Sequence, residues 1–213
     1  MEYDRLAKIL IIGDYDSKGC NLQYHLAHSR YYVSGIGIDF VIRTIQTDEE
    51  KVKFQIWDAS SYSRFRTIHP PLYRGTSVLL VAYNPMIETT FRNIQRWLEE
   101  ADIHLSSPAI RMLVEHTSSH DRPREVPIGA GKEMAESLGL LYGEVDSTFE
   151  RYNDDILKLL ADELHFAFPL DDVQPSSRPP QPPLKTSSGD IRIKYPIVLS
   201  LLFLFFVVVF FFC

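Results

Sequence analysis

Residues 13–20, GDYDSKGC, follow an apolar stretch and could begin a phosphate-binding loop. Such a loop has the pattern G-x-x-x-x-G-K-[ST], in which backbone N–H groups face the phosphates, the lysine neutralises them and the hydroxyl holds Mg²⁺. Gly13 is in place, but the next three key positions hold Lys18, Gly19 and Cys20. A soft thiol is a poor ligand for Mg²⁺, which prefers hard oxygen. The stretch therefore predicts the turn of a phosphate-binding loop without its lysine and hydroxyl.

Alternating strand and helix patterns would position this loop. Apolar runs predict strands at 6–13, 38–47, 51–57, 77–83, 109–114 and 140–145. Helical periodicity predicts helices between the loop and residue 28 and at 89–101, 130–138 and 150–166. Strands that alternate with helices favour a doubly wound α/β fold, here a mostly parallel six-stranded sheet with one antiparallel edge strand. Ligands bind such sheets at the carboxyl ends of the strands, where the loop after Gly13 would lie.

Four short stretches closely resemble signature stretches of the Rab small GTPases. They are IGIDF (36–40), KFQIWD (53–58), RFRTI (64–68) and LYRG (72–75). The resemblance extends over residues 6–168 and implies the small-GTPase fold with its phosphate-binding loop. It also implies a role in vesicle-mediated intracellular protein transport, and binding of GTP or GDP with Mg²⁺ where the site is intact.

The resemblance assigns the nucleotide contacts of that family to positions that mostly hold other residue types here. Asp58 keeps its type and would contact Mg²⁺ if the ion binds at all. Gly35 stands at the switch threonine, Ser61 at the glycine that senses the γ-phosphate, and Tyr62 at the glutamine that orients the attacking water. We therefore assign no catalytic residue. The nucleotide-contacting positions are Gly13, Asp16, Lys18, Gly19, Cys20, Gly35, Asp58, Ser61, His116, Thr117, Ser119 and Ser147.

The base-recognition motif N-K-x-D of the family matches residues 116–119, which read HTSS. Its aspartate accepts hydrogen bonds from guanine, and leaving such donors unpaired costs about 1–3 kcal/mol each. Of the family's S-A-K loop, a backbone N–H at Ser147 would remain. We expect a pseudo-GTPase binding module with lost or weak GTP binding. The alternatives are a working GTPase that hydrolyses GTP with atypical residues, and a decayed gene product without a selected function.

The resemblance also implies a surface for protein effectors or tethers. Ile36, Phe40, Trp57 and Leu72 belong to it, together with the stretch 64–75. Phe40 and Trp57 match two of three aromatic residues that Rabs present to effectors, and Leu72 stands at the third position. Packing beneath the hairpin is the alternative role of the two rings.

Other residue groups give weaker indications of a metal site, a disulfide framework or a nucleic-acid partner. Glu115, His116 and His120 have a spacing that could hold a metal ion on a helix, but we expect solvated histidines in a serine-rich loop. The two cysteines, Cys20 and Cys213, suggest neither a disulfide framework nor a zinc site. A formal net charge of −6 without a basic cluster argues against nucleic acid as a partner.

The composition changes after the predicted domain, residues 1–168. Residues 169–194 form a Pro/Ser-rich linker that we expect to be disordered. Within it, the stretch from Pro180 to Lys185 has a form that polyproline-binding grooves accept, although such runs usually serve as plain spacers.

Residues 195–213 are predicted to be a membrane anchor. From residue 197 onward every residue but Ser200 is apolar, and a helix of this length spans roughly 25 Å. Arg192 and Lys194 precede it, as expected of a cytosolic flank. We therefore expect a domain on the cytosolic face of an intracellular membrane, held by its C-terminal apolar helix. A helix buried against the domain and a prenyl group on Cys213 are the alternatives.

Overall fold

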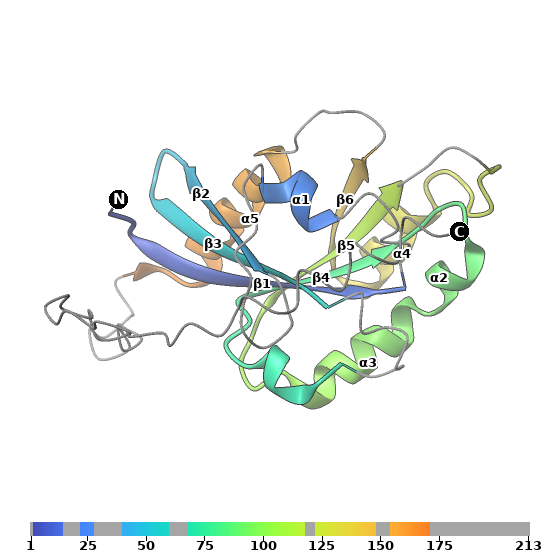
Figure 1. Ribbon diagram of the computed structural model, residues 1–213, viewed down its shortest axis with the longest axis horizontal. Helices are drawn as coiled ribbons and strands as arrows, with labels where there is room; N and C mark the ends of the chain where they lie inside the picture. The colour runs from blue at the N-terminus through green and yellow to red at the C-terminus, as the bar shows by residue number, and fades with distance from the viewer. Residues whose placement is uncertain are drawn as a thin grey trace, which may run out of the picture. The chain divides into compact units, whose positions relative to one another are not determined.

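The computed structural model describes residues 2–14, 22–27, 40–59, 68–117, 122–147 and 154–170 (Figure 1). Within these ranges strands alternate with helices along the chain, as the sequence pattern predicts.

One six-stranded sheet forms the centre of the domain, with the strand order β2-β3-β1-β4-β5-β6. The edge strand β2 pairs antiparallel with β3, and the remaining neighbours pair parallel. This arrangement confirms the predicted doubly wound fold with one antiparallel edge strand. The strands are β1 Arg5–Gly13, β2 Phe40–Gln46, β3 Lys51–Asp58, β4 Val78–Tyr83, β5 Ile110–Thr117 and β6 Leu141–Asp146.

Helices cover both faces of the sheet. Figure 1 shows α1 and α5 on one side of the sheet and α3 on the other, and α4 packs in the same apolar core as α3. The helices are α1 Leu22–Ala27, α2 Glu88–Arg92, α3 Ile94–His104, α4 Ala130–Leu138 and α5 Asp154–Ala167, with a 3-10 helix, η2, at Pro70–Tyr73.

Two apolar cores result from the alternation of side chains along the central strands. Ile9 and Ile11 of β1 point into the core beneath α1 and α5, whereas Leu10 and Ile12 point into the core beneath α3 and η2. All four are fully buried, as expected for a central strand with helices on both faces. Each such side chain contributes about 1.5–3 kcal/mol through burial.

The helix predicted at 89–101 is interrupted at Asn93, so that two helices, α2 and α3, take its place. Asn93 has φ −83° and ψ −3°, and its N–H donates to the carbonyl of Thr89. Its side-chain amide donates to Asp14 at 2.7 Å. This tertiary contact lies outside the helical pattern and gives a reason for the break. Trp97 and Leu98 of α3 face inward, since they are 0% and 8% exposed.

Strand β5 is longer than the predicted strand 109–114 and ends at Thr117. Its pairing with β6 continues through His116↔Val145 and Thr117↔Asp146. Residues that we expected in a loop therefore belong to the sheet, and their side chains alternate between its two faces.

Candidate functional site at the carboxyl edge of the sheet

The predicted nucleotide-contacting residues that the structure describes lie at one edge of the sheet. Gly13 ends β1, Asp58 ends β3, His116 and Thr117 end β5, and Ser147 directly follows β6. Because these strands are parallel, their carboxyl ends meet at the same edge. The other predicted residues lie outside the described ranges: Asp16, Lys18, Gly19, Cys20, Gly35, Ile36, Ser61, Tyr62, Ser119 and Cys213.

Gly13 occupies a position that only glycine fits. Its φ is +130°, a conformation that other residues rarely adopt, and it pairs with Ala82 of β4. A Cβ atom on residue 13 would collide with the carbonyl oxygen of Ala82. The chain thus retains the backbone turn with which a phosphate-binding loop begins.

The carboxylate of Asp14, the next residue, is bound by the α2–α3 junction. Asn93 Nδ2 donates to Asp14 Oδ2 at 2.7 Å, and Arg96 Nη2 lies 3.3 Å from the same oxygen. The chain itself therefore holds the start of this loop. The role of Asp14 could not be predicted from the sequence, because its partners are distant in the chain and no spacing rule links them.

Asp58, the predicted Mg²⁺-contacting residue, is 8% exposed at the end of β3. The N–H of Ala59 donates to the carbonyl of Ile11 at 2.9 Å, which keeps this strand end beside β1. In the described ranges, no group of three or more His, Cys, Asp or Glu residues could hold a metal ion.

His116 stands at the first position of the predicted base-recognition motif, and its side chain is fully buried. Its Nε2 is hydrogen-bonded to Ser147 Oγ at 2.7 Å. The expectation of a solvated histidine is therefore wrong for His116. The reason is that β5 extends past the predicted loop boundary, which places the ring on the face that α1 covers.

The electrostatic surroundings keep the His116 ring neutral. Burial lowers its pKa to about 4, the neighbouring His25 on α1 lowers it as well, and Asp146 acts in the opposite direction. The pKa of His25 is itself lowered by burial. At neutral pH the His116 imidazole therefore carries no charge that could assist ligand binding.

A backbone N–H at this edge is also already hydrogen-bonded within the protein. The N–H of Ser147 donates to the carbonyl of Thr117 at 2.8 Å. This N–H is the donor that the sequence left available for a guanine base. With it engaged, and with His116 and Ser147 bonded to each other, the described residues of this edge do not fit a guanine base.

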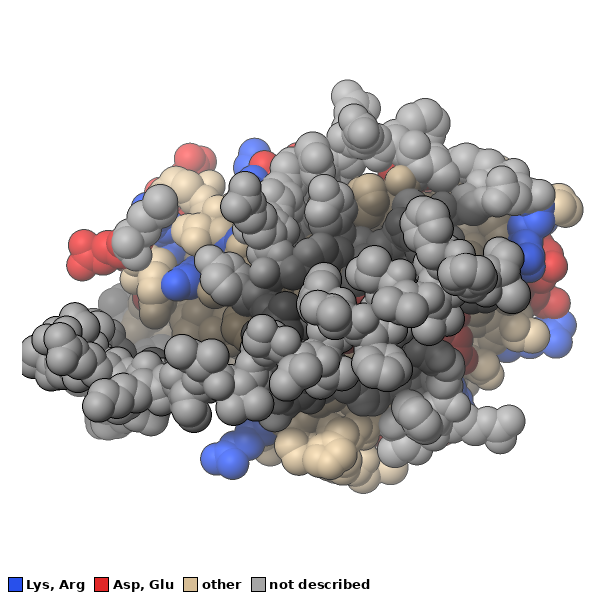
Figure 2. Space-filling model, viewed as in Figure 1, with Lys and Arg blue, Asp and Glu red and all other residues tan. Residues whose placement is uncertain are grey.

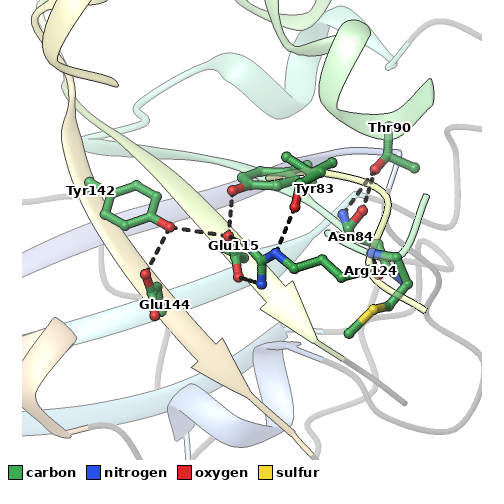
Figure 3. Close-up of polar contacts among 9 residues, drawn as sticks. Tyr83, Asn84, Thr90, Glu115, Arg124, Tyr142 and Glu144 are labelled. Carbon is green, nitrogen blue, oxygen red and sulfur yellow. Dashed lines mark hydrogen bonds and ion pairs between the residues drawn. The ribbon is translucent and has the colours of Figure 1, made fainter. Parts of the chain in front are cut away.

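A partly buried polar cluster that no sequence pattern predicts surrounds Glu115 (Figure 3). Arg124 Nη1 donates to Glu115 Oε1 at 2.7 Å and Arg124 Nη2 to Oε2 at 2.6 Å. The hydroxyls of Tyr83 and Tyr142 donate to Oε2 at 2.6 and 3.2 Å. Burial opposes ionisation of Glu115, but the hydrogen bonds from Arg124 and Tyr83 outweigh it and lower the pKa of this carboxyl.

The chain around Arg124 joins this cluster to the connection between β4 and α2. Arg124 Nε donates to the carbonyl of Val126 at 2.6 Å, and the N–H groups of Glu125 and Val126 donate to the carbonyl of Pro85 at 3.1 and 3.0 Å. Glu125 Oε2 accepts a 2.8 Å hydrogen bond from the N–H of Glu88, at the start of α2. These contacts fix the chain that returns from the predicted base-recognition loop.

The contacts of Glu115 also bear on the metal site that the spacing of Glu115, His116 and His120 suggested. Glu115 and His116 are adjacent on a strand, so their side chains point to opposite faces of the sheet. Glu115 contacts Arg124, whereas His116 contacts Ser147. These two residues therefore cannot share a metal ion, and His120 lies outside the described residues.

Among the predicted partner-facing residues that the structure describes, Phe40 and Trp57 are half-buried, whereas Leu72 is buried. The rings of Phe40 and Trp57 stack with centroids 4.6 Å apart and an interplanar angle of 18°. Leu72 is 8% exposed and packs in the core beneath α3, so its side chain contributes to the core more than to a surface. Whether Phe40 and Trp57 contact effectors stays a prediction.

Of the helices that the structure describes, none combines the length and the apolar character needed to cross a bilayer. The predicted anchor and almost the whole of the predicted linker lie in residues 171–213, outside the described ranges.

Comparisons with known proteins agree with the fold. The model of the Ras family matches residues 8–165. The chain is similar to the Ras-related protein RABD2a of Arabidopsis thaliana, with 36% identity over 68% of this chain and 73% of the relative. It is also similar to the Ras-related protein RIC1 of Oryza sativa subsp. japonica, with 37% identity over 68% of this chain and 74% of the relative.

Proposed function

Because the chain belongs to the Ras family of small GTPases and is Rab-like, we propose that it serves intracellular vesicle transport as a pseudo-GTPase. In this role it binds partner proteins and does not act as a GTP-driven switch. Its affinity for GTP and GDP is lost or weak. The surface around Phe40, Trp57 and the stretch 64–75 contacts effectors or tethers.

The observation that carries this proposal is the closed base-recognition edge. The Ser147 N–H is bonded to the Thr117 carbonyl, and the neutral His116 ring is bonded to the Ser147 hydroxyl. A guanine base that accepted a hydrogen bond from the Ser147 N–H would have to break its bond to Thr117 and leave that carbonyl without this donor. Each buried polar group left unsatisfied in this way costs about 1–3 kcal/mol.

Residue types outside the described ranges support the same proposal. Gly19 provides no ammonium group for the phosphates, and Ser119 provides no carboxylate for guanine. Two lost charged contacts of about 1.5–3 kcal/mol each reduce the affinity by roughly two to four orders of magnitude.

A working Rab-type GTPase is the second candidate. The retained backbone turn at Gly13 and the retained carboxylate of Asp58 favour it. It would bind GTP or GDP together with Mg²⁺, although the described residues do not fit the base.

We further propose that the domain lies on the cytosolic face of an intracellular membrane. The apolar stretch from residue 197 to Cys213 would anchor it there, and the proline-rich linker would separate it from the bilayer. A prenyl group on Cys213 is an additional or alternative anchor. The stretch from Pro180 to Lys185 is a candidate ligand for a polyproline-binding partner.

The nucleotide content of the purified protein tests the main proposal. The full-length chain is extracted in mild detergent with Mg²⁺ present, denatured, and its released nucleotides are quantified by chromatography. We expect far less than one nucleotide per chain, and by calorimetry no GTP or GDP affinity tighter than roughly millimolar. Stoichiometric GDP or GTP would instead establish the working GTPase. Capture of a partner only with a GTP analogue would likewise contradict a nucleotide-independent role.

A further inference from the structure

The segment from Ile68 to Gly75, which includes η2, is held by charged side chains from two sides. On one side, Glu100 Oε1 of α3 accepts hydrogen bonds from the N–H of Ile68 at 2.8 Å and from the hydroxyl of Tyr73 at 3.2 Å. On the other side, Lys8 Nζ of β1 donates to the carbonyls of Leu72 and of Arg74, the latter at 3.0 Å. This segment is the described part of the predicted partner-facing stretch 64–75.

Lys8 also contacts the aromatic pair of the hairpin. Its ammonium lies 5.3 Å from the centroid of the Trp57 ring, and that ring stacks on Phe40. An ammonium this close to an indole face is attracted to it. Burial lowers the pKa of Lys8 to about 8. A continuous set of contacts therefore runs from Phe40 through Trp57 and Lys8 to the carbonyls at the end of η2.

Lys8 itself lies away from the candidate nucleotide edge, although its partner Trp57 directly precedes Asp58. Lys8 precedes Gly13 by five positions on β1, which corresponds to about 16 Å along a strand. Its backbone contacts Ser77, just before β4, since the Ser77 N–H donates to the Lys8 carbonyl at 2.9 Å. The groups that hold the segment thus belong to β1, β3 and α3, and they require no phosphate.

We propose that Lys8 is a positioning residue that fixes the segment Ile68–Gly75 against the Phe40–Trp57 pair, so that this surface has one arrangement with or without nucleotide. The inference rests on the proposed role of this surface in partner binding. It explains how a chain without a working switch presents a defined surface, because Lys8 and Glu100 hold the segment through contacts within the protein.

Hydrogen exchange of the full-length protein in detergent micelles, read by mass spectrometry, tests the inference. Lys8→Met keeps a side chain of similar length and removes its ammonium donors. We therefore expect backbone amides of residues 68–77 to exchange about tenfold faster. Lys8→Arg keeps a charged donor and should restore most of the protection. Lys53→Met is the matched control, because the Lys53 ammonium lies over the Tyr3 ring at 4.9 Å. In all variants, residues 110–117 of β5 should exchange as in the wild type.

The outcomes separate this inference from the proposed function. Equal protection of residues 68–77 in Lys8→Met and wild type would overturn the inference, whatever the nucleotide content. So would wild-type protection of these residues that rises on addition of a GTP analogue with Mg²⁺. Bound nucleotide in the purified protein would overturn the proposed function but leave the comparison of Lys8 variants intact. If Lys8→Met does not fold, Lys8→Leu, which also lacks a donor, provides the same comparison.

Discussion

Acidification should destabilise this protein through His116, and the effect can be worked out from its surroundings. The ring is fully buried and its pKa in the folded state is lowered from 6.5 to about 4. In the unfolded chain the ring binds a proton near pH 6.5, whereas the folded chain resists protonation until about pH 4. The unfolded state therefore binds more protons between these values, and stability falls as the pH falls through this window.

The size of this loss follows from the two pKa values. One pKa unit corresponds to about 1.4 kcal/mol, so His116 should lower the free energy of unfolding by about 3 kcal/mol between pH 7 and pH 4. This is a large part of the roughly 5–15 kcal/mol that stabilises a typical domain. His25, whose pKa is lowered by burial, should add to the loss in the same direction.

Urea unfolding followed by circular dichroism, at several pH values from 7 to 4, measures this contribution. His116→Asn removes the titrating ring, so its stability should fall with pH by about 3 kcal/mol less than that of the wild type. The two proteins are compared in how their free energies of unfolding change with pH. The values at a single pH are not compared, because the variant also loses the hydrogen bond to Ser147. His69→Asn is the matched control, since it makes the same replacement at an exposed histidine. Identical pH dependence in His116→Asn and wild type would refute the reasoning.

Three further changes should have separate effects. Arg124→Met should lower the free energy of unfolding by about 2–3 kcal/mol in urea titrations, because it leaves the Glu115 carboxylate buried without its cation; a loss below about 0.5 kcal/mol would contradict a structural role for the pair. Gly13→Ala should cost well over about 1 kcal/mol in thermal unfolding, whereas Gly139→Ala, also at positive φ but with open space for a Cβ, should cost about 1 kcal/mol. Deletion of residues 197–213 should release the protein from membranes in carbonate extraction while Cys213→Ser stays bound; release by Cys213→Ser alone would instead indicate a prenyl anchor.

The sequence predicts the sheet and most of its elements because their signals are local. Apolar runs and helical periodicity locate the strands and α4, whose bounds Ala130–Leu138 agree with the predicted helix. The break at Asn93 and the end of β5 at Thr117 were missed. Both depend on tertiary contacts, the first with Asp14 and the second with β6, which no local pattern contains.

The candidate site was predictable in position but not in its contacts. The resemblance places His116 and Ser147 at the carboxyl edge, and the structure brings them together there. The residue types alone could not indicate that they bond to each other, or that the Ser147 N–H is used by Thr117. The Glu115–Arg124 pair was not predicted at all, because an acidic residue after an apolar run has many possible partners.

The same cluster has an evolutionary consequence. Arg124, Tyr83 and Tyr142 all converge on one buried carboxylate, so the loss of any one partner leaves polar groups unsatisfied. Substitutions in such a network are not additive, and single steps away from it pass through less stable intermediates. His116→Asn alone would also leave the Ser147 N–H bonded to Thr117. Replacing one side chain at this edge therefore does not free the backbone donor that a guanine base would need.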